Sequence, residues 1–175
     1  MPTHITVTAY SFDELSDKAK DKARNWFRNG IDVYKWSDSV IEDAANVGIK
    51  ITGFDIGRGS EIDGDVEDTE GTAHAIVKDH GEESDTYKLA VQYLADRDEA
   101  IDSEPKDEDG EFEDQNAMDE KLNELDDEFT RAILEEYLSE LRSEYEYRMS
   151  DEAIDEDIRA NEYLFTKDGS RSTSL

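Results

Sequence analysis

Cysteine is absent from this chain of 175 residues, and proline occurs twice. Without cysteine the chain cannot form disulfides or thiolate metal sites, which argues against a small secreted fold. No apolar run approaches the roughly 20 residues that a membrane-spanning helix needs. The segment Met1–Tyr10 alternates polar and apolar residues and lacks a signal-peptide core. We therefore expect a cytoplasmic protein.

Basic residues are also scarce, with 19 Lys and Arg against 48 Asp and Glu and a net charge of -29. Affinity for phosphates and for anionic membranes rests on Lys and Arg, so nucleic acid and membrane surfaces are poor partners. A field of this sign attracts basic proteins. The charge is uneven: residues 1–59 hold 9 acids and 8 bases, whereas residues 60–175 hold 39 acids and 11 bases.

Histidine is equally rare, and the sequence shows no catalytic or metal-binding pattern. The histidines are His4, His74 and His80, and the last two are six residues apart, which does not place them on one helix face. The segment from Asp63 resembles half a calcium-binding loop, but its sixth position is Asp68 instead of glycine and its twelfth is His74 instead of glutamate. We expect no metal, no cofactor and no enzymatic activity.

Hydrophobic periodicity predicts an α+β fold in a single domain, residues 1–175. We expect a small antiparallel or mixed sheet, packed with several helices, that contains all the predicted strands. The predicted strands are Thr3–Tyr10, Ile49–Arg58 and Tyr163–Thr166, with a hairpin turn at Asp63-Gly64. Predicted helices begin at the caps Ser16, Ser37, either Ser84 or Asp85, and Ser150. The segment Thr72–His80 is compatible with either a strand or a short helix.

The longest predicted element is an acidic amphipathic helix in the C-terminal half, from about Asn116 to Met149, with room for one break. It follows an acidic segment with Pro105 and Gly110, for which we predict a mobile loop over residues 103–114. Residues 170–175 are predicted to be a polar tail.

Carboxylates on this helix and loop are the candidate partner-binding residues. On the helix they lie away from the apolar stripe at helical spacing, and those in the loop supplement them. A solvated face that only maintains solubility is the plainer interpretation. The candidates are Glu120, Glu124, Asp127, Glu128, Glu135 and Glu136 on the helix, and Asp107, Glu108, Asp109, Glu111 and Glu113 in the loop.

Three segments resemble a family of small acidic proteins encoded by bacteriophages and prophages, many of which are labelled as antitoxins of toxin–antitoxin stability systems. They are Phe12–Arg28, Trp36–Ala44 and Ser150–Asp168. The chain departs from the family at Gly53–Asp65, where many members have an aromatic, glycine-rich stretch and this one has Phe54 alone. The resemblance implies a phage origin and a bacterial cytoplasm, and it implies no active site.

Together these observations predict a phage-encoded inhibitor that occupies a basic DNA-binding cleft of a host defence protein by mimicking DNA. Restriction enzymes, CRISPR effectors and host nucleases have such clefts. An antitoxin that covers a basic toxin is the alternative, and an acidic domain without DNA mimicry is the third possibility. The expected partner is a basic protein, and a homodimer is compatible with the sequence.

Overall fold

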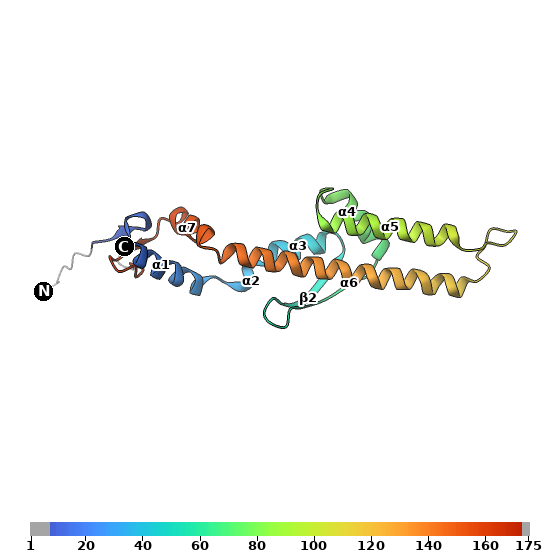
Figure 1. Ribbon diagram of the computed structural model, residues 1–175, viewed down its shortest axis with the longest axis horizontal. Helices are drawn as coiled ribbons and strands as arrows, with labels where there is room; N and C mark the ends of the chain where they lie inside the picture. The colour runs from blue at the N-terminus through green and yellow to red at the C-terminus, as the bar shows by residue number, and fades with distance from the viewer. Residues whose placement is uncertain (1–7, 173–175) are drawn as a thin grey trace. The chain divides into compact units, whose positions relative to one another are not determined.

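The structure is a computed structural model that describes residues 8–172, and the strand predicted from Thr3 falls largely outside them. The described chain has an α+β architecture, and its residues form two compact units. The end unit takes in both chain ends, up to Trp36 and from Ser143 onward, and the central unit is Ser37–Arg142. Figure 1 shows the elements of each unit.

The end unit packs two helices and a short strand pair around one core. Its elements are β1 (Tyr10–Ser11), η1 (Phe12–Glu14), α1 (Asp17–Gly30), α2 (Val33–Trp36), α7 (Asp151–Ala160) and β4 (Leu164–Phe165). Strands β1 and β4 are antiparallel. The buried residues of this core are Phe12, Leu15, Ala19, Ala23, Ile154, Ile158 and Phe165. Small side chains on α1 let α7 approach closely.

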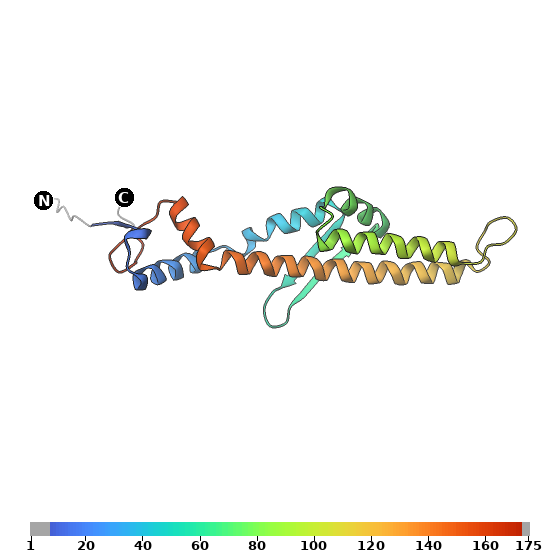
Figure 2. The same cartoon turned by 45° about the horizontal axis from the view of Figure 1, so that its top comes forward.

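The central unit packs four helices against a two-stranded antiparallel sheet. Its elements are α3 (Asp38–Asn46), β2 (Ile49–Asp55), β3 (Glu61–Val66), α4 (Thr69–Asp79), α5 (Asp85–Ser103) and most of α6 (Gln115–Arg148). Helices α5 and α6 lie side by side in both ribbon views (Figures 1 and 2). The rings of Tyr93 on α5 and Phe129 on α6 stack in the core, with centroids 4.5 Å apart.

Helix caps confirm several predicted boundaries. Ser16, Ser84 and Ser150 each accept a hydrogen bond from the backbone nitrogen three residues on, which satisfies a donor that the first helical turn leaves open. Ser37 begins α3 but makes no such capping bond. Helix α6 is continuous over its 34 residues, so the break that the sequence allowed does not occur.

The predicted single sheet is wrong. Among the described strands β4 pairs with β1, and β2 pairs with β3 in a separate sheet. The two strand pairs pack on different hydrophobic cores. Strands β2 and β3 pack on the core of the central unit, and β1 and β4 pack on the core of the end unit. The segment Thr72–His80, left open between strand and helix, belongs to helix α4.

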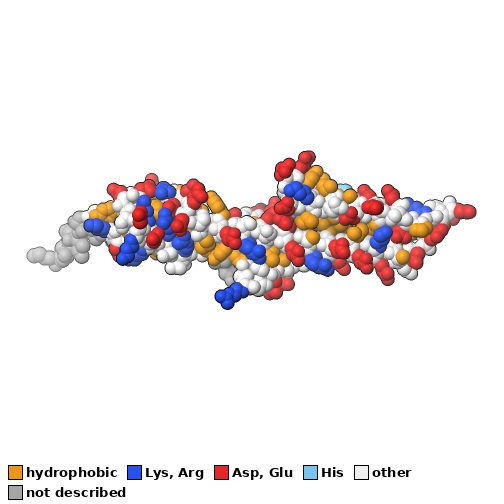
Figure 3. All heavy atoms as spheres, in the orientation of Figure 1, with side chains coloured by type: hydrophobic (Ala, Val, Ile, Leu, Met, Phe, Trp, Pro, Cys, Tyr) orange, Lys and Arg blue, Asp and Glu red, His pale blue; other side chains and the backbone are white. Residues whose placement is uncertain are grey.

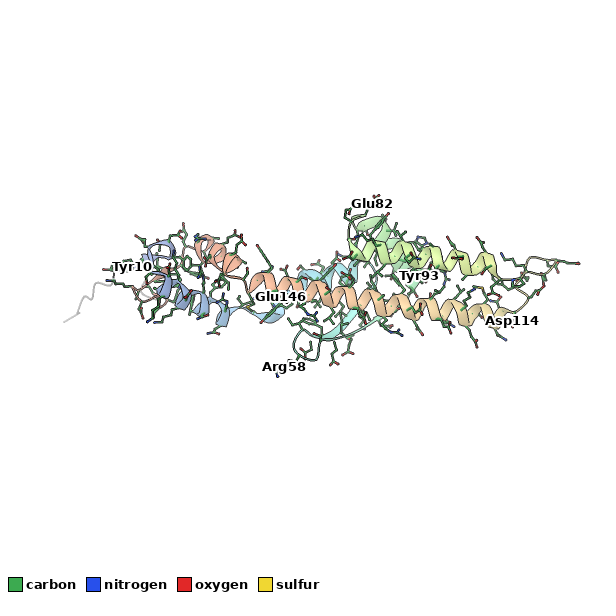
Figure 4. The ribbon with its side chains drawn as sticks, in the orientation of Figure 1. Tyr10, Arg58, Glu82, Tyr93, Asp114 and Glu146 are labelled. Atoms are coloured by element: carbon green, nitrogen blue, oxygen red, sulfur yellow. The ribbon has the colours of Figure 1, made fainter. Side chains whose placement is uncertain are left out.

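The predicted hairpin turn at Asp63-Gly64 is also wrong, because these residues lie inside β3 and the turn falls at 56–60, where Figure 4 labels Arg58. The lack of a side chain at Gly64 lets α6 and the neighbouring strand β2 lie close to β3. A Cβ there would lie 2.7 Å from Cδ2 of Leu134 on α6 and 2.8 Å from the carbonyl oxygen of Lys50. The glycine in this strand pattern therefore indicates a close contact between β3 and α6, and not a turn.

Candidate functional site

Charge divides sharply between the two units. The central unit holds 34 acids and 9 bases, a net of -25, and the end unit holds 14 acids and 10 bases, a net of -4. Figure 3 shows Asp and Glu side chains along the α5–α6 hairpin on the face in view, interspersed with apolar side chains and with some Lys and Arg. The division by unit differs from the division along the sequence, because residues 143–175, with 9 acids and 4 bases, belong to the end unit.

The bases of the end unit hold its own acids in ion pairs. Arg24 on α1 donates two hydrogen bonds of 2.7 Å each to Asp155 on α7. The Arg159 guanidinium bonds Asp13 and lowers the pKa of that carboxyl. Lys22 donates a hydrogen bond of 2.5 Å to Asp168 and lowers the pKa of that carboxyl well below its usual range. These pairs neutralise part of the acidic charge of the end unit within the unit itself.

Five of the six predicted helix carboxylates form one exposed acidic stripe on α6. The stripe is Glu120, Glu124, Asp127, Glu128 and Glu135. Within the described part of the chain none of the five forms an ion pair. Exposed Arg131 lies at helical spacing within the stripe and interrupts it. The stripe remains strongly anionic, because one base stands against five acids.

Glu136 does not belong to this stripe. Its side chain is half-buried, and burial raises its pKa, with a further contribution from Asp85 at the start of α5 and an opposing one from Lys88. Helical spacing alone could not show this, because α5 covers the face of α6 on which Glu136 lies. A partner that approaches the stripe would not contact it.

The loop carboxylates lie on a hydrogen-bonded turn. The Asp107 carboxylate accepts from the backbone nitrogens of Asp109 and Glu111 at 2.9 Å, and Gly110 adopts a positive φ of 84°. Lys106 and Phe112 form an isolated antiparallel bridge across the loop. Asp107 therefore shapes the loop, and all five loop candidates are exposed: Asp107, Glu108, Asp109, Glu111 and Glu113. Mobility of the loop stays a prediction.

A second acidic row, which the sequence analysis missed, lies on β3. Glu61, Asp63 and Asp65 occupy alternate positions and are all exposed, whereas Ile62 and Val66 turn inward. The alternation of residues 61–66 is the signal that could have shown it, but the Asp63-Gly64 pair was interpreted as a turn. Asp98, Glu99 and Asp102 add exposed carboxylates near the end of α5.

A partly buried polar cluster lies beneath the start of α5. It comprises buried Thr86 and Tyr137, half-buried His80 and Glu140, and Asp43, whose side chain is 51% exposed. His80 Nδ1 lies 2.7 Å from the Thr86 hydroxyl, and the Tyr137 hydroxyl donates to Asp43 at 2.8 Å. His80 Nε2 lies 3.5 Å from Asp43 Oδ2, but the buried nitrogen makes no hydrogen bond of acceptable geometry. Burial, with Asp43 and Glu136 nearby, raises the pKa of Glu140 to about 7.

The order Thr86, His80, Asp43 matches that of a hydroxyl nucleophile, a base and an orienting acid. Thr86 is only 1% exposed, however, so a substrate could not reach its hydroxyl. Over residues 8–172 no group of His, Asp and Glu side chains is arranged to hold a metal ion. The cluster therefore stands as a packing and titration feature of the central unit, not as a reaction centre.

The segments that carry the family resemblance lie mainly in the end unit, where Phe12–Arg28 and Ser150–Asp168 contribute α1 and α7. Comparison with protein-family models, with curated proteins and with solved structures finds no match. Among the described helices none is both long and apolar enough to cross a membrane. The acidic surface of the central unit is therefore the main feature from which a function can be inferred.

Proposed function

We propose that the central unit is an anionic mimic of DNA that occupies the basic DNA-binding cleft of a bacterial defence protein. The observation that carries the proposal is the segregation of charge, with a net of -25 on the central unit and -4 on the end unit. The proposed partner is basic and binds without nucleic acid, metal or catalysis.

The spacing of the carboxylates supports mimicry of a phosphate backbone. Carboxylates four residues apart on α6 are about 6 Å apart along its axis. Alternate positions on β3 are about 7 Å apart. Duplex DNA carries one charge per ~1.7 Å of axis, so a net of -25 corresponds to roughly 12 base pairs. A cleft that binds a short duplex would meet a comparable charge.

The energetic burden of the stripe also supports a use. Like charges at i,i+4, such as Glu120 with Glu124 and Glu124 with Glu128, oppose helix formation by a few tenths of a kcal/mol per pair. In the end unit, by contrast, arginines form ion pairs with some of the carboxylates. A surface that served only solubility could have its carboxylates in ion pairs, as the end unit does. Unpaired carboxylates on α6 therefore suggest a further use.

An antitoxin that covers a basic toxin is the second candidate. It draws on the same charge and on the label that accompanies the family resemblance. The phage origin and the bacterial cytoplasm come from that resemblance alone. The two candidates differ in the partner's surface: a DNA mimic competes with duplex DNA for its partner, whereas an antitoxin need not.

The proposal is tested by capturing partners from a bacterial lysate at low salt and measuring their affinity for two matched variants. The first replaces Glu120, Glu124 and Glu128 with Gln and Asp127 with Asn. The control removes four exposed, unpaired charges from the end unit, by Gln at Glu146, Glu152 and Glu156 and Asn at Asp157. Loss of the stripe should weaken binding at least tenfold, about 1.4 kcal/mol.

At physiological salt the control should bind within about twofold of the unmodified protein, since exposed charges that the partner does not contact are largely screened. Equal losses in both variants would mean that total charge, not the acidic stripe, attracts the partner. Unchanged affinity in the first variant, with its helical circular dichroism intact, would leave the stripe as a solvated face and remove the support for mimicry.

A further inference from the structure

An apolar groove runs between α5 and α6 beside the acidic stripe. Its walls are Leu89 and Leu125, and its floor is the stacked pair Tyr93 and Phe129. Figure 4 shows Tyr93 between the two helices. The groove has a volume of about 170 Å³. Pockets for small-molecule ligands are typically ~300–1,000 Å³, so this groove has room for one large side chain and not for a substrate.

The floor of the groove is held in place from below. The Tyr93 hydroxyl donates to Asp126 at 2.5 Å, and Asp126 lies 3.4 Å from Arg97, which in turn reaches Glu70 on α4 at 3.1 Å. These bonds hold the phenol oxygen in place and so restrain displacement of the ring. A preformed floor lowers the entropic cost of binding.

Carboxylates stand at the edges of the groove. Asp96 lies on the α5 side, where Gln92 donates to it at 2.7 Å, and Glu128 of the acidic stripe lies on the α6 side. An apolar floor between anionic edges is complementary to a segment that carries one apolar side chain among basic ones. It disfavours a second copy of this chain, whose surface around the same groove is acidic.

We infer that the α5–α6 groove receives one leucine- or methionine-sized side chain from a basic segment of the partner, with Lys or Arg one helical turn to either side contacting Asp96 and Glu128. This inference rests on the proposed function and adds to it a specific anchor. Charge attracts the partner from a distance, and the buried side chain sets the position at which it binds. Such anchors in desolvated pockets contribute most of the energy of many interfaces.

The inference is tested with two labelled helical peptides of alanine and lysine, about 18 residues long so that they hold a helix alone. One has a central leucine, and the other has alanine at that position. Fluorescence anisotropy measures their binding to the full chain. The leucine peptide should bind about tenfold more tightly, which is the effect of burying one leucine side chain.

A variant that fills the groove without changing charge provides the control. Ala132, on the α6 side of the groove, is replaced by Trp. The A132W variant should lose the advantage of the leucine peptide and bind the alanine peptide within about twofold of the unmodified protein. Circular dichroism and the thermal midpoint show whether the variant folds, and the two-peptide comparison on the unmodified protein needs no variant.

The outcomes separate the two proposals. Equal, salt-sensitive binding of both peptides would overturn the groove and leave the anionic function standing. No binding of either peptide at low salt would count against the function itself and against the groove with it. A dimer in sedimentation that A132W dissociates would show that a second copy fills the groove, which would also overturn the inference.

Discussion

Glu140 is the residue whose environment departs most from that of an ordinary surface carboxylate. Its folded pKa is about 7, against 4.5 for a free glutamate, because of burial and because Asp43, Glu136 and Asp85 are close. His80 lies beside Asp43 in the same cluster, at 3.5 Å. Between these two pKa values the folded state holds a proton on Glu140 that the unfolded chain releases. The contribution of this proton to the free energy of unfolding is fully present below about pH 4.5 and is lost as the pH rises through about 7.

Replacing Glu140 with Gln keeps the side chain neutral at every pH. Relative to the unmodified protein, the variant should be close in stability near pH 5 and more stable by about 1–2 kcal/mol at pH 8, after allowance for partial solvent screening. Urea unfolding at both pH values measures the difference. Glu135→Gln, on the exposed stripe, is the control and should show little change with pH. A Glu140→Gln variant that is less stable at pH 8 would contradict this account of the cluster.

Gly64 illustrates a second residue-scale constraint. Replacing it with Ala would place a methyl group within 2.7 Å of Leu134 Cδ2 and 2.8 Å of the Lys50 carbonyl oxygen, so the Leu134 side chain and the backbone of β2 must both move. We expect a loss of about 1–3 kcal/mol in the free energy of unfolding. Gly59→Ala, in the turn, has no atom within 4 Å of the added Cβ and should be close to neutral. Similar values for both variants would show that the contact of Gly64 with α6 is not tight.

At the scale of elements, the helices were largely predictable and the strand pairing was not. Hydrophobic spacing and the caps Ser16, Ser84 and Ser150 defined α1, α5 and α7, because capping is a local interaction. Strand partners depend on contacts between distant segments, and nothing local in residues 49–55 or 164–165 indicated that their strands belong to different sheets. The same limit applies to the site, since exposure of the stripe followed from spacing but burial of Glu136 did not.

Packing of α1 against α7 should depend on the Arg24–Asp155 pair. The Asp155 side chain is only 15% exposed, so removing Arg24 leaves a carboxylate partly buried without its partner. Arg24→Ala should lower the free energy of unfolding by about 2–3 kcal/mol. Arg148→Ala breaks a more exposed pair with Glu144 on one helix and should cost about 0.5 kcal/mol or less. Chemical denaturation distinguishes the two, and equal small effects would show that the pair contributes little.

At the scale of the whole molecule, the dominant feature is repulsion among the charges of the central unit, which holds -25 of the -29. The Debye length falls from about 30 Å at 10 mM salt to about 8 Å at 150 mM. Salt should therefore stabilise the central unit and stabilise the end unit less, because there it also screens favourable ion pairs. Hydrogen exchange at α4 and α5, compared with α1 and α7, measures this difference. Equal protection gains in both units would contradict it.

The central claim is that the acidic surface of the central unit and duplex DNA occupy the same basic cleft. The direct measurement is competition: the captured partner, bound to labelled protein at fixed salt, is titrated with a short linear duplex, and the released protein is followed by anisotropy. The account predicts full displacement, with a midpoint that rises in proportion to the concentration of the protein, and easier displacement of the variant that lacks the charges of Glu120, Glu124, Asp127 and Glu128. A partner that binds protein and duplex at once would contradict DNA mimicry and favour an antitoxin that covers a different basic surface.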